Sequence, residues 1–203
     1  MMKFRLAIMA AALVLLFGLA GYSWYASLHA HRVVTSQSDP AVRIGGPFRL
    51  TNQDGKVVTE AALRGKWSLV FFGYTYCPEV CPLTLQSLAR TQDLLGDKAE
   101  QVQIVFITVD PARDTPANLK AYLASHGFPR GVTGLTGTQA QIDAVLKAYR
   151  AEATRKDVSG GYDFSHTAYV YLMNPQGEFA EPLSIELGPE KNAGLIRDAM
   201  RGN

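Results

Sequence analysis

The stretch WSLVFFGYTYCPEVCP, residues 67–82, decides the fold. Residues 67–72 are apolar except for Ser68 and include β-branched and aromatic side chains, which predicts a central strand buried on both faces. Pro82 suits the first position of a helix, because the N–H group that it lacks would be unpaired there in any case. Leucines then recur with helical spacing until Gly96. The stretch therefore predicts a strand, a short turn and a helix.

The remainder of the chain alternates between strand-like and helix-like apolar patterns, which predicts an α/β fold. A turn signal at residues 52–55 joins two short strands in a hairpin, and Thr138 with Gln141 forms a capping box ahead of a helix. The other expected elements are a strand at 102–109, a helix opened by Asp114, Thr115 and Pro116 and closed by Gly127, a strand at 167–173, a turn at 174–177, a return strand at 178–180 and a last helix from Pro189. This order predicts a thioredoxin-like sandwich with an N-terminal β-hairpin extension.

The folded part is preceded by an apolar segment. Lys3 and Arg5 come before a run of apolar and small residues that reaches about Leu28. A run of roughly 20 such residues can cross a bilayer as a helix, whereas the core of a signal peptide is about 7–15 residues long. We therefore expect a cytoplasmic start and a single transmembrane anchor at 1–30, a linker at 31–46 and a thioredoxin-like domain at 47–203. A signal peptide cut near Ala20 or Ala30 is the alternative.

Charge and length narrow the possible functions. The 203 residues carry a formal net charge of only +2, and lysines and arginines are scattered along the chain. Nucleic-acid-binding domains concentrate basic residues in a stripe or patch, so we do not expect this class of partner. Because the basic residues near the N-terminus precede the expected anchor, the positive-inside tendency places the domain across the membrane.

The only two cysteines, Cys77 and Cys81, lie in the turn between the central strand and its helix. Unpaired N–H groups at the start of a helix lower the pKa of a nearby thiol and favour the thiolate. A structural disulfide would close a very short loop and contribute about 2 kcal/mol, against about 4.7 kcal/mol for a loop of 100 residues. We therefore favour reactive or metal-binding thiols.

The spacing of the cysteines leaves two kinds of chemistry open. Thiol-disulfide oxidoreductases of this fold favour two intervening residues, whereas three separate Cys77 from Cys81. The wider spacing permits a disulfide and also lets both sulfurs bind one ion, for which copper(I) is the natural match and zinc the competitor. Two sulfurs leave a site incomplete. His166 is the leading candidate for a third ligand, because it directly precedes the strand expected beside the cysteine turn.

Three segments resemble the Sco/SenC family: FFGYTYCPEVCP at 71–82, VDPARDT at 109–115 and DFSHT at 163–167. The resemblance runs in order from about Pro47 to the C-terminus, and the cysteine motif is its most specific part. It implies a thioredoxin-like fold and a copper ion, Cu(I) or Cu(II), bound by Cys77, Cys81 and His166. It also implies delivery or priming of copper for the binuclear site of cytochrome c oxidase subunit II, with other copper chaperones as further partners. Together with the expected anchor, the resemblance also implies a location in the bacterial inner membrane, with the domain on the periplasmic side.

One departure from the family pattern affects the expected site. Many relatives have Asp immediately before the histidine, where this chain has Ser165. Asp163 could supplement the site only if its loop folds back, and a turn residue after Gly160 and Gly161 is an equal interpretation.

The remaining candidates have simpler interpretations beside the functional ones. Asp110 and Asp114 could form the rim of the site, although we expect Asp114 to cap a helix. Met173 is expected in the core. Further candidates are His29 and His31, which we expect to be ordinary polar residues after the anchor, and Tyr74, Tyr76 and Phe164, which either form an apolar collar for a partner or simply pack.

Two functional hypotheses follow. The first is a membrane-anchored copper chaperone that transfers its ion by ligand exchange. The second is a thiol-disulfide reductase that acts on cysteines of the oxidase subunit or of another copper carrier, with Cys77 as nucleophile and Cys81 as the resolving thiol. A thiol peroxidase is disfavoured, because Thr75 is only two residues before Cys77.

Overall fold

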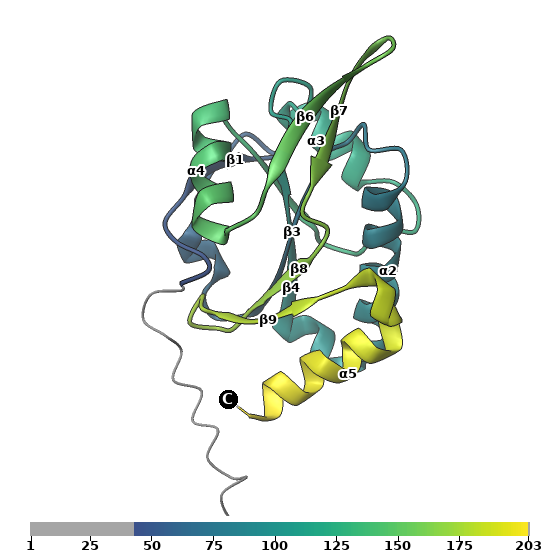
Figure 1. Ribbon diagram of the computed structural model, residues 1–203. Coiled ribbons are helices and arrows are strands. Elements are labelled where there is room, and N and C mark those ends of the chain that lie inside the picture. Colours follow the sequence, from purple (N-terminus) through teal and green to yellow (C-terminus); the bar gives the residue numbers. More distant parts are fainter. Residues whose placement is uncertain (1–42, 203) are drawn as a thin grey trace, which may run out of the picture. The chain divides into compact units, whose positions relative to one another are not determined.

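A seven-stranded mixed sheet forms the centre of residues 43–202, the part of the chain that the computed structural model describes (Figure 1). Its strands lie in the order β2-β1-β5-β4-β3-β8-β9. They are β1 (Arg49–Asn52), β2 (Val57–Thr59), β3 (Trp67–Gly73), β4 (Val102–Thr108), β5 (Thr133–Thr136), β8 (Val170–Met173) and β9 (Phe179–Leu183). Strands β3, β4 and β5 are parallel, and the others pair antiparallel to their neighbours.

Helices cover both faces of this sheet (Figure 1). They are α2 (Val80–Leu95), α3 (Pro116–Leu123), α4 (Gln139–Tyr149) and α5 (Gly188–Arg201), with short 3₁₀ segments η1 (Glu60–Leu63), η2 (Gly96–Gln101) and η3 (Ile185–Leu187). Helix α4 lies on one face, while α2, α3 and α5 lie on the other. This is the layered α/β sandwich that the alternating pattern predicts.

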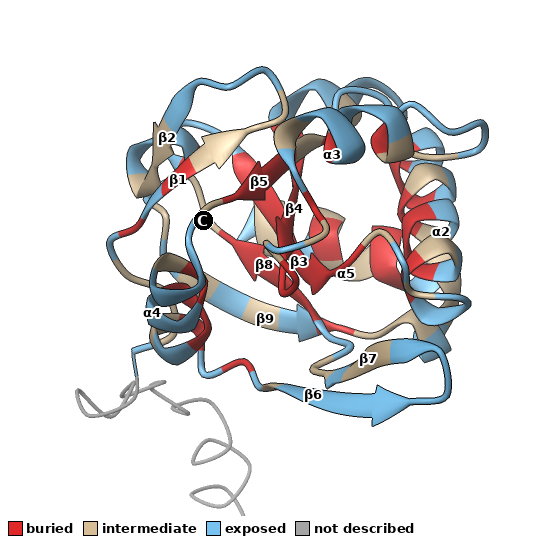
Figure 2. Ribbon diagram, turned by 90° about the horizontal axis from the view of Figure 1, so that it is seen from above, coloured by how far each residue is buried: buried red, intermediate tan, exposed pale blue. Residues whose placement is uncertain are grey.

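Strand β3 is buried along its whole length, so its side chains fill the core on both faces (Figure 2). Successive side chains of a strand point to opposite faces. Phe71 accordingly packs against Phe106 of β4, while Phe72 packs edge-on against Tyr149 of α4 and Tyr171 of β8. Met173 is fully buried in the same core, as expected.

A second, two-stranded sheet lies apart from the first. It consists of β6 (Ala153–Val158) and β7 (Gly161–His166), which pair antiparallel with Ala153 opposite His166. This β6–β7 hairpin projects beyond the large sheet in Figure 1, and most of β6 is exposed. At its base, the Thr167 N–H group donates to the Glu152 carbonyl at 2.9 Å.

Several sequence predictions are confirmed. The N-terminal hairpin forms as β1 and β2, and the Asn52 carboxamide accepts hydrogen bonds from the N–H groups of Asp54 and Lys56 in the expected turn. The strands at β3 and β4 and the helix after Pro189 are present. The capping box of α4 is complete, because Thr138 and Gln141 each accept a hydrogen bond from the other's backbone N–H group.

Other predictions are wrong in ways that matter for the site. Helix α2 begins at Val80, two residues early, so Cys81 lies in its first turn. Pro82 is tolerated there because the first four N–H groups of a helix are unpaired. Strand β8 begins only at Val170, which leaves His166 at the end of β7. Strands β5, β6 and β7 were not predicted, β9 extends to Leu183 and α3 ends at Leu123, before Gly127.

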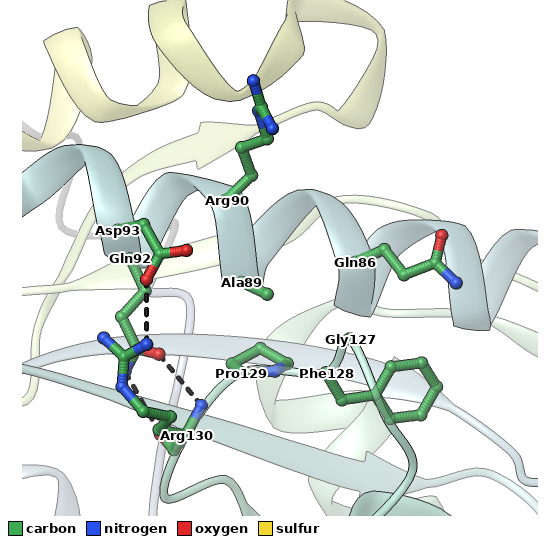
Figure 3. A pocket seen from close by; sticks show the side chains of 9 residues that line it. All are labelled: Gln86, Ala89, Arg90, Gln92, Asp93, Gly127, Phe128, Pro129 and Arg130. Atoms are coloured by element: carbon green, nitrogen blue, oxygen red, sulfur yellow. Dashed lines mark hydrogen bonds and ion pairs between the residues drawn. The ribbon is translucent and has the colours of Figure 1, made fainter.

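A shallow hollow lies between α2 and the loop 127–130 (Figure 3). Gln92 secures this loop, since its side chain accepts from the Arg130 N–H group at 2.9 Å and donates to the Arg130 carbonyl at 3.1 Å. Asp93 adds an exposed ion pair with the Arg130 guanidinium at 2.9 Å. These contacts explain how the loop that leads into β5 is held without regular structure of its own.

The predicted anchor and the first part of the linker, with His29 and His31, lie outside the described residues. Within residues 43–202, no helix is both long enough and apolar enough to span a bilayer.

We predict that Thr138→Ala lowers the free energy of unfolding by about 1 kcal/mol, because the N-cap hydrogen bond of α4 is lost. Urea unfolding measures this change. Thr59→Ala is the matched control, since Thr59 precedes η1 but its side chain makes no cap hydrogen bond. Equal losses in the two variants would contradict the assignment.

Candidate metal centre

The two cysteines lie at the end of β3, where the chain turns into α2. The Cys77 N–H group donates to the Tyr74 carbonyl at 3.2 Å and closes the turn. Cys81 is completely buried and Cys77 is half-buried, and both are free thiols. The Cys81 N–H group donates to the Cys77 sulfur at 3.3 Å. Cys81 is therefore enclosed by the protein, whereas Cys77 is only partly covered.

Gly73 makes room for the buried thiol. A Cβ atom at this position would lie 2.8 Å from the Cys81 sulfur and 2.8 Å from the Phe106 ring. Real side chains do not approach so closely, so any other residue at the end of β3 would displace Cys81. The apolar strand pattern at 67–72 does not predict this role, although a glycine in a strand often marks such a close approach.

His166 reaches the cysteines from the end of β7. Its Nε2 atom is 3.5 Å from the Cys81 sulfur, and its Nδ1 atom is 3.0 Å from the Thr167 carbonyl. Because a carbonyl only accepts, Nδ1 donates in this contact, and Nε2 is the ring atom directed at the sulfurs. The rings of Phe71 and Tyr74 contact the imidazole edge-on, at centroid distances of 6.2 and 5.8 Å.

The structure thus brings together the three side chains singled out from the sequence. The two sulfurs and one imidazole nitrogen all lie within 4.8 Å of one another. Sulfur and nitrogen ligands lie about 2.0–2.3 Å from an ion such as zinc, so small shifts suffice for all three to share one ion. Two thiolates and an imidazole form a soft donor set that suits Cu(I).

The two thiols differ sharply in acidity. The pKa of Cys77 is lowered to about 4, chiefly by the hydrogen bond from the Cys81 thiol, with His166 and backbone N–H groups adding to the effect. The pKa of Cys81 is raised, because its thiol donates that hydrogen bond and is buried. In the metal-free site Cys77 is therefore the thiolate and Cys81 the thiol.

Asp114 holds the cysteine turn by hydrogen bonds to Thr75. Its predicted role as a helix cap is wrong. Thr115 is the N-cap of α3 and accepts from the Asn118 N–H group at 3.2 Å. Asp114 is fully buried and accepts from the Thr75 N–H group at 3.1 Å, from the Thr75 hydroxyl at 2.6 Å and from the Thr108 hydroxyl. Burial raises the pKa of this carboxyl. The side chain faces inward because Thr75 of the turn offers it two donors and Thr108 of β4 a third.

Asp163 lies on β7 rather than in a turn. Its carboxylate accepts a hydrogen bond from the Tyr74 hydroxyl, which lowers the pKa of Asp163. It is not among the residues whose ligand atoms cluster, since that group consists of Cys77, Cys81 and His166 within the described residues. Asp163 therefore acts on the site through Tyr74, whose ring contacts His166.

The three residues of the expected apolar collar, Tyr74, Tyr76 and Phe164, differ in their exposure to solvent. Tyr74 is buried, and its ring packs against Phe164 at 5.6 Å. Tyr76 is 60% exposed, and the Arg113 guanidinium lies 4.6 Å from its ring centre. Tyr74 and Phe164 thus pack as part of the site's wall, while Tyr76 offers an exposed ring beside Cys77.

The chain matches the SCO1/SenC family over residues 36–201. It is 38% identical over 165 residues to the mitochondrial protein SCO2 of Saccharomyces cerevisiae, covering 79% of this chain but only 54% of that protein. Among solved structures, the ScoI protein of Bradyrhizobium japonicum with copper bound is 43% identical, with a TM-score of 0.70 over 78% of this chain and 98% of that one.

A second solved structure concerns BsSco, described as a member of the Sco family of cytochrome c oxidase assembly proteins in which a disulfide switch was identified. It is 30% identical, with a TM-score of 0.63 over 80% of this chain and 94% of that chain. These likenesses confirm the predicted thioredoxin-like α/β fold.

We predict that iodoacetamide alkylates Cys77 of the reduced, metal-free full chain at half its maximal rate near pH 4, because the lowered pKa keeps its thiolate present above that pH. The rate should be flat between about pH 6 and 8, where an ordinary thiol still gains reactivity toward its pKa near 8.5. Mass spectrometry of peptides after alkylation separates Cys77 from Cys81. Cys81→Ala should move the midpoint to higher pH, and a wild-type rate that keeps rising to pH 9 would contradict the assignment.

We also predict that Gly73→Ala lowers the free energy of unfolding by about 1–3 kcal/mol, because its Cβ atom overlaps Cys81 and Phe106. Gly194→Ala is the control. Gly194 lies in α5 with open space around its Cα atom, so alanine there should stabilise the helix by up to about 1 kcal/mol. Chemical denaturation measures both changes, and a neutral Gly73→Ala would refute the close approach.

Proposed function

The chain belongs to the SCO1/SenC family, and from this membership and the geometry of the candidate site we propose that it is a copper-binding protein of cytochrome c oxidase assembly. One copper ion is held by Cys77, Cys81 and His166. The observation that carries the proposal is the convergence of two sulfurs from one turn with an imidazole nitrogen from a separate hairpin.

The family and the donor set together support copper. Three donors converge here within the described residues, fewer than the four of a structural zinc site, although zinc also binds a Cys₂His set when water is the fourth ligand. Soft thiolates select Cu(I), and imidazole also suits Cu(II), so the same three residues serve either oxidation state. The pre-set tautomer of His166 supports this role, because Nδ1 is occupied by the Thr167 carbonyl and Nε2 is free to bind.

The unequal burial of the sulfurs supports transfer by ligand exchange. Cys77 is half-buried at the surface beside the exposed Tyr76 ring, so a partner thiolate can approach the ion from this side. We propose the binuclear site of cytochrome c oxidase subunit II as the recipient and other copper chaperones as further partners. Residues 1–30 serve as a single-pass anchor in the bacterial inner membrane, residues 31–46 as linker, and the domain at 47–203 lies on the periplasmic side.

Reduction of partner disulfides is the second candidate, and the acidity of Cys77 favours it. The Cys77 thiolate attacks one sulfur of a partner disulfide and releases the other as a thiolate. Cys81, after losing its proton, then attacks the mixed disulfide. The partner leaves with both cysteines reduced, and Cys77 and Cys81 form a disulfide.

Metal analysis of the reduced full chain, purified without oxygen, tests the primary proposal. We predict about one copper ion per wild-type chain and little in Cys77→Ser, Cys81→Ser or His166→Ala, because two donors bind an ion far less tightly than three. His126→Ala is the matched control, since His126 is an exposed imidazole far along the chain from either site segment. Equal copper in all five proteins would refute the proposal.

The His166→Ala variant also separates the two functions. Copper retention should fall while thiol-disulfide exchange of the reduced chain with an oxidised peptide partner continues, because exchange needs only the two cysteines. If oxidase assembly in cells survives His166→Ala but fails in Cys77→Ser, reductase activity rather than copper binding is the essential function.

A further inference from the structure

The β6–β7 hairpin delivers His166 but belongs to a sheet of its own. Its position relative to the cysteines therefore depends on contacts outside the main-chain ladder of the large sheet. One such contact is the hydrogen bond from Tyr74 to Asp163, already described. A second and larger set of contacts holds the neighbouring residue, Tyr162.

Three contacts bind Tyr162 to the loop after β4. The Tyr162 hydroxyl donates to the Asp110 carboxylate at 3.0 Å, and the Tyr162 carbonyl accepts from Nη1 of Arg113 at 3.2 Å. The Arg113 guanidinium also lies over the Tyr162 ring, 3.9 Å from its centre. We call Asp110, Arg113 and Tyr162 the Tyr162 cluster.

Arg113 is the centre of this cluster. Its Nε atom forms an ion pair with Asp110, whose side chain is 2% exposed. Its guanidinium lies over the rings of both Tyr162 and Tyr76, so it contacts the hairpin and the cysteine turn. A planar guanidinium can stack on rings and donate in fixed directions at once, which an ammonium group cannot.

We propose that Arg113 is a positioning residue for the third ligand: it fastens the β6–β7 hairpin to the loop after β4 and so keeps His166 beside Cys77 and Cys81. This inference rests on the proposed copper-binding function. The segment 110–114 then serves both halves of the site, because Asp114 holds the cysteine turn through Thr75 while Arg113 and Asp110 hold the hairpin through Tyr162.

The hairpin supplies a matched control. The Arg155 guanidinium also lies over the Tyr162 ring, 3.8 Å from its centre, but Arg155 belongs to β6 of the same hairpin. It therefore makes a comparable cation–π contact without linking the hairpin to the rest of the fold. Arg113→Lys and Arg155→Lys each keep the positive charge and remove a guanidinium from that ring.

Hydrogen exchange in the metal-free full chain provides the first readout. Arg113→Lys should speed exchange of the backbone amides of β6 and β7 about tenfold, because a charged hydrogen bond and a stacked cation no longer hold the hairpin. Amides of β3 and β4 should exchange as in the wild type. Arg155→Lys should leave both sets within about twofold of wild type, as expected for an exposed charge.

Copper(I) affinity, measured by competition with a chelator, provides the second readout. Arg113→Lys should weaken binding about tenfold and Arg155→Lys should not, because only a loosened hairpin withdraws His166. Should Arg113→Lys fail to fold, Tyr162→Leu serves instead, since it removes the ring and hydroxyl that the cluster holds.

The outcomes separate this inference from the proposed function. If the wild-type chain binds no copper, the proposed function fails, while hydrogen exchange still decides whether Arg113 holds the hairpin. If exchange is unchanged in Arg113→Lys, or is accelerated equally in both variants, the positioning role of Arg113 is wrong. Faster exchange with unaltered copper affinity would likewise overturn it, because His166 would then be held by other contacts.

Discussion

The 3.5 Å approach of the His166 ring to the buried Cys81 sulfur is the contact on which the rest of the site depends. Cys81 lies in the first turn of α2, and His166 ends β7 of the separate two-stranded sheet, so no backbone ladder fixes the distance between them. Each side must therefore be placed by its own packing. On the cysteine side, Gly73 lets the thiol lie against the end of β3; on the histidine side, Phe71 and Tyr74 contact the ring edge-on. Tyr74 contributes twice, because its hydroxyl also binds Asp163 on the histidine hairpin.

The loop after β4 organises these contacts through four polar residues of the segment 110–115, which have different partners. Asp110 and Arg113 face the hairpin, Asp114 faces the cysteine turn, and Thr115 caps α3. Buried carboxylates are costly unless they are paired or hydrogen-bonded, and each of these two has such partners. The parallel pairing of β3 with β4 brings this loop next to the cysteine turn, because the carboxyl ends of parallel strands meet at one edge of a sheet.

Much of this arrangement could be predicted from the sequence, and the parts that could not share a physical cause. Strand β3 and helix α2 carry strong apolar patterns, so burial dictates them locally. Strand β6 is rich in charged residues and largely exposed, and in β7 only Tyr162 and Phe164 give an alternating apolar pattern. Neither sequence therefore predicts a strand in preference to a loop. The nearness of His166 to the cysteines rested mainly on a family resemblance, since nothing in local periodicity connects residues 85 positions apart. Asp114 was misassigned because adjacent Asp and Thr residues suit the same cap, and only the tertiary donors Thr75 and Thr108 decide between them.

The unequal acidity of the two thiols has a consequence for the uptake of metal. A thiolate, not a thiol, binds a metal ion, and the Cys81 sulfur carries its proton in the metal-free site because burial and the hydrogen bond to Cys77 raise its pKa. An entering ion must therefore expel a proton from the interior of the protein into solution. Metal uptake is thus linked to hydrogen-ion activity, and acidification favours release of the ion. The link is made by the enclosed Cys81 sulfur rather than by that of Cys77.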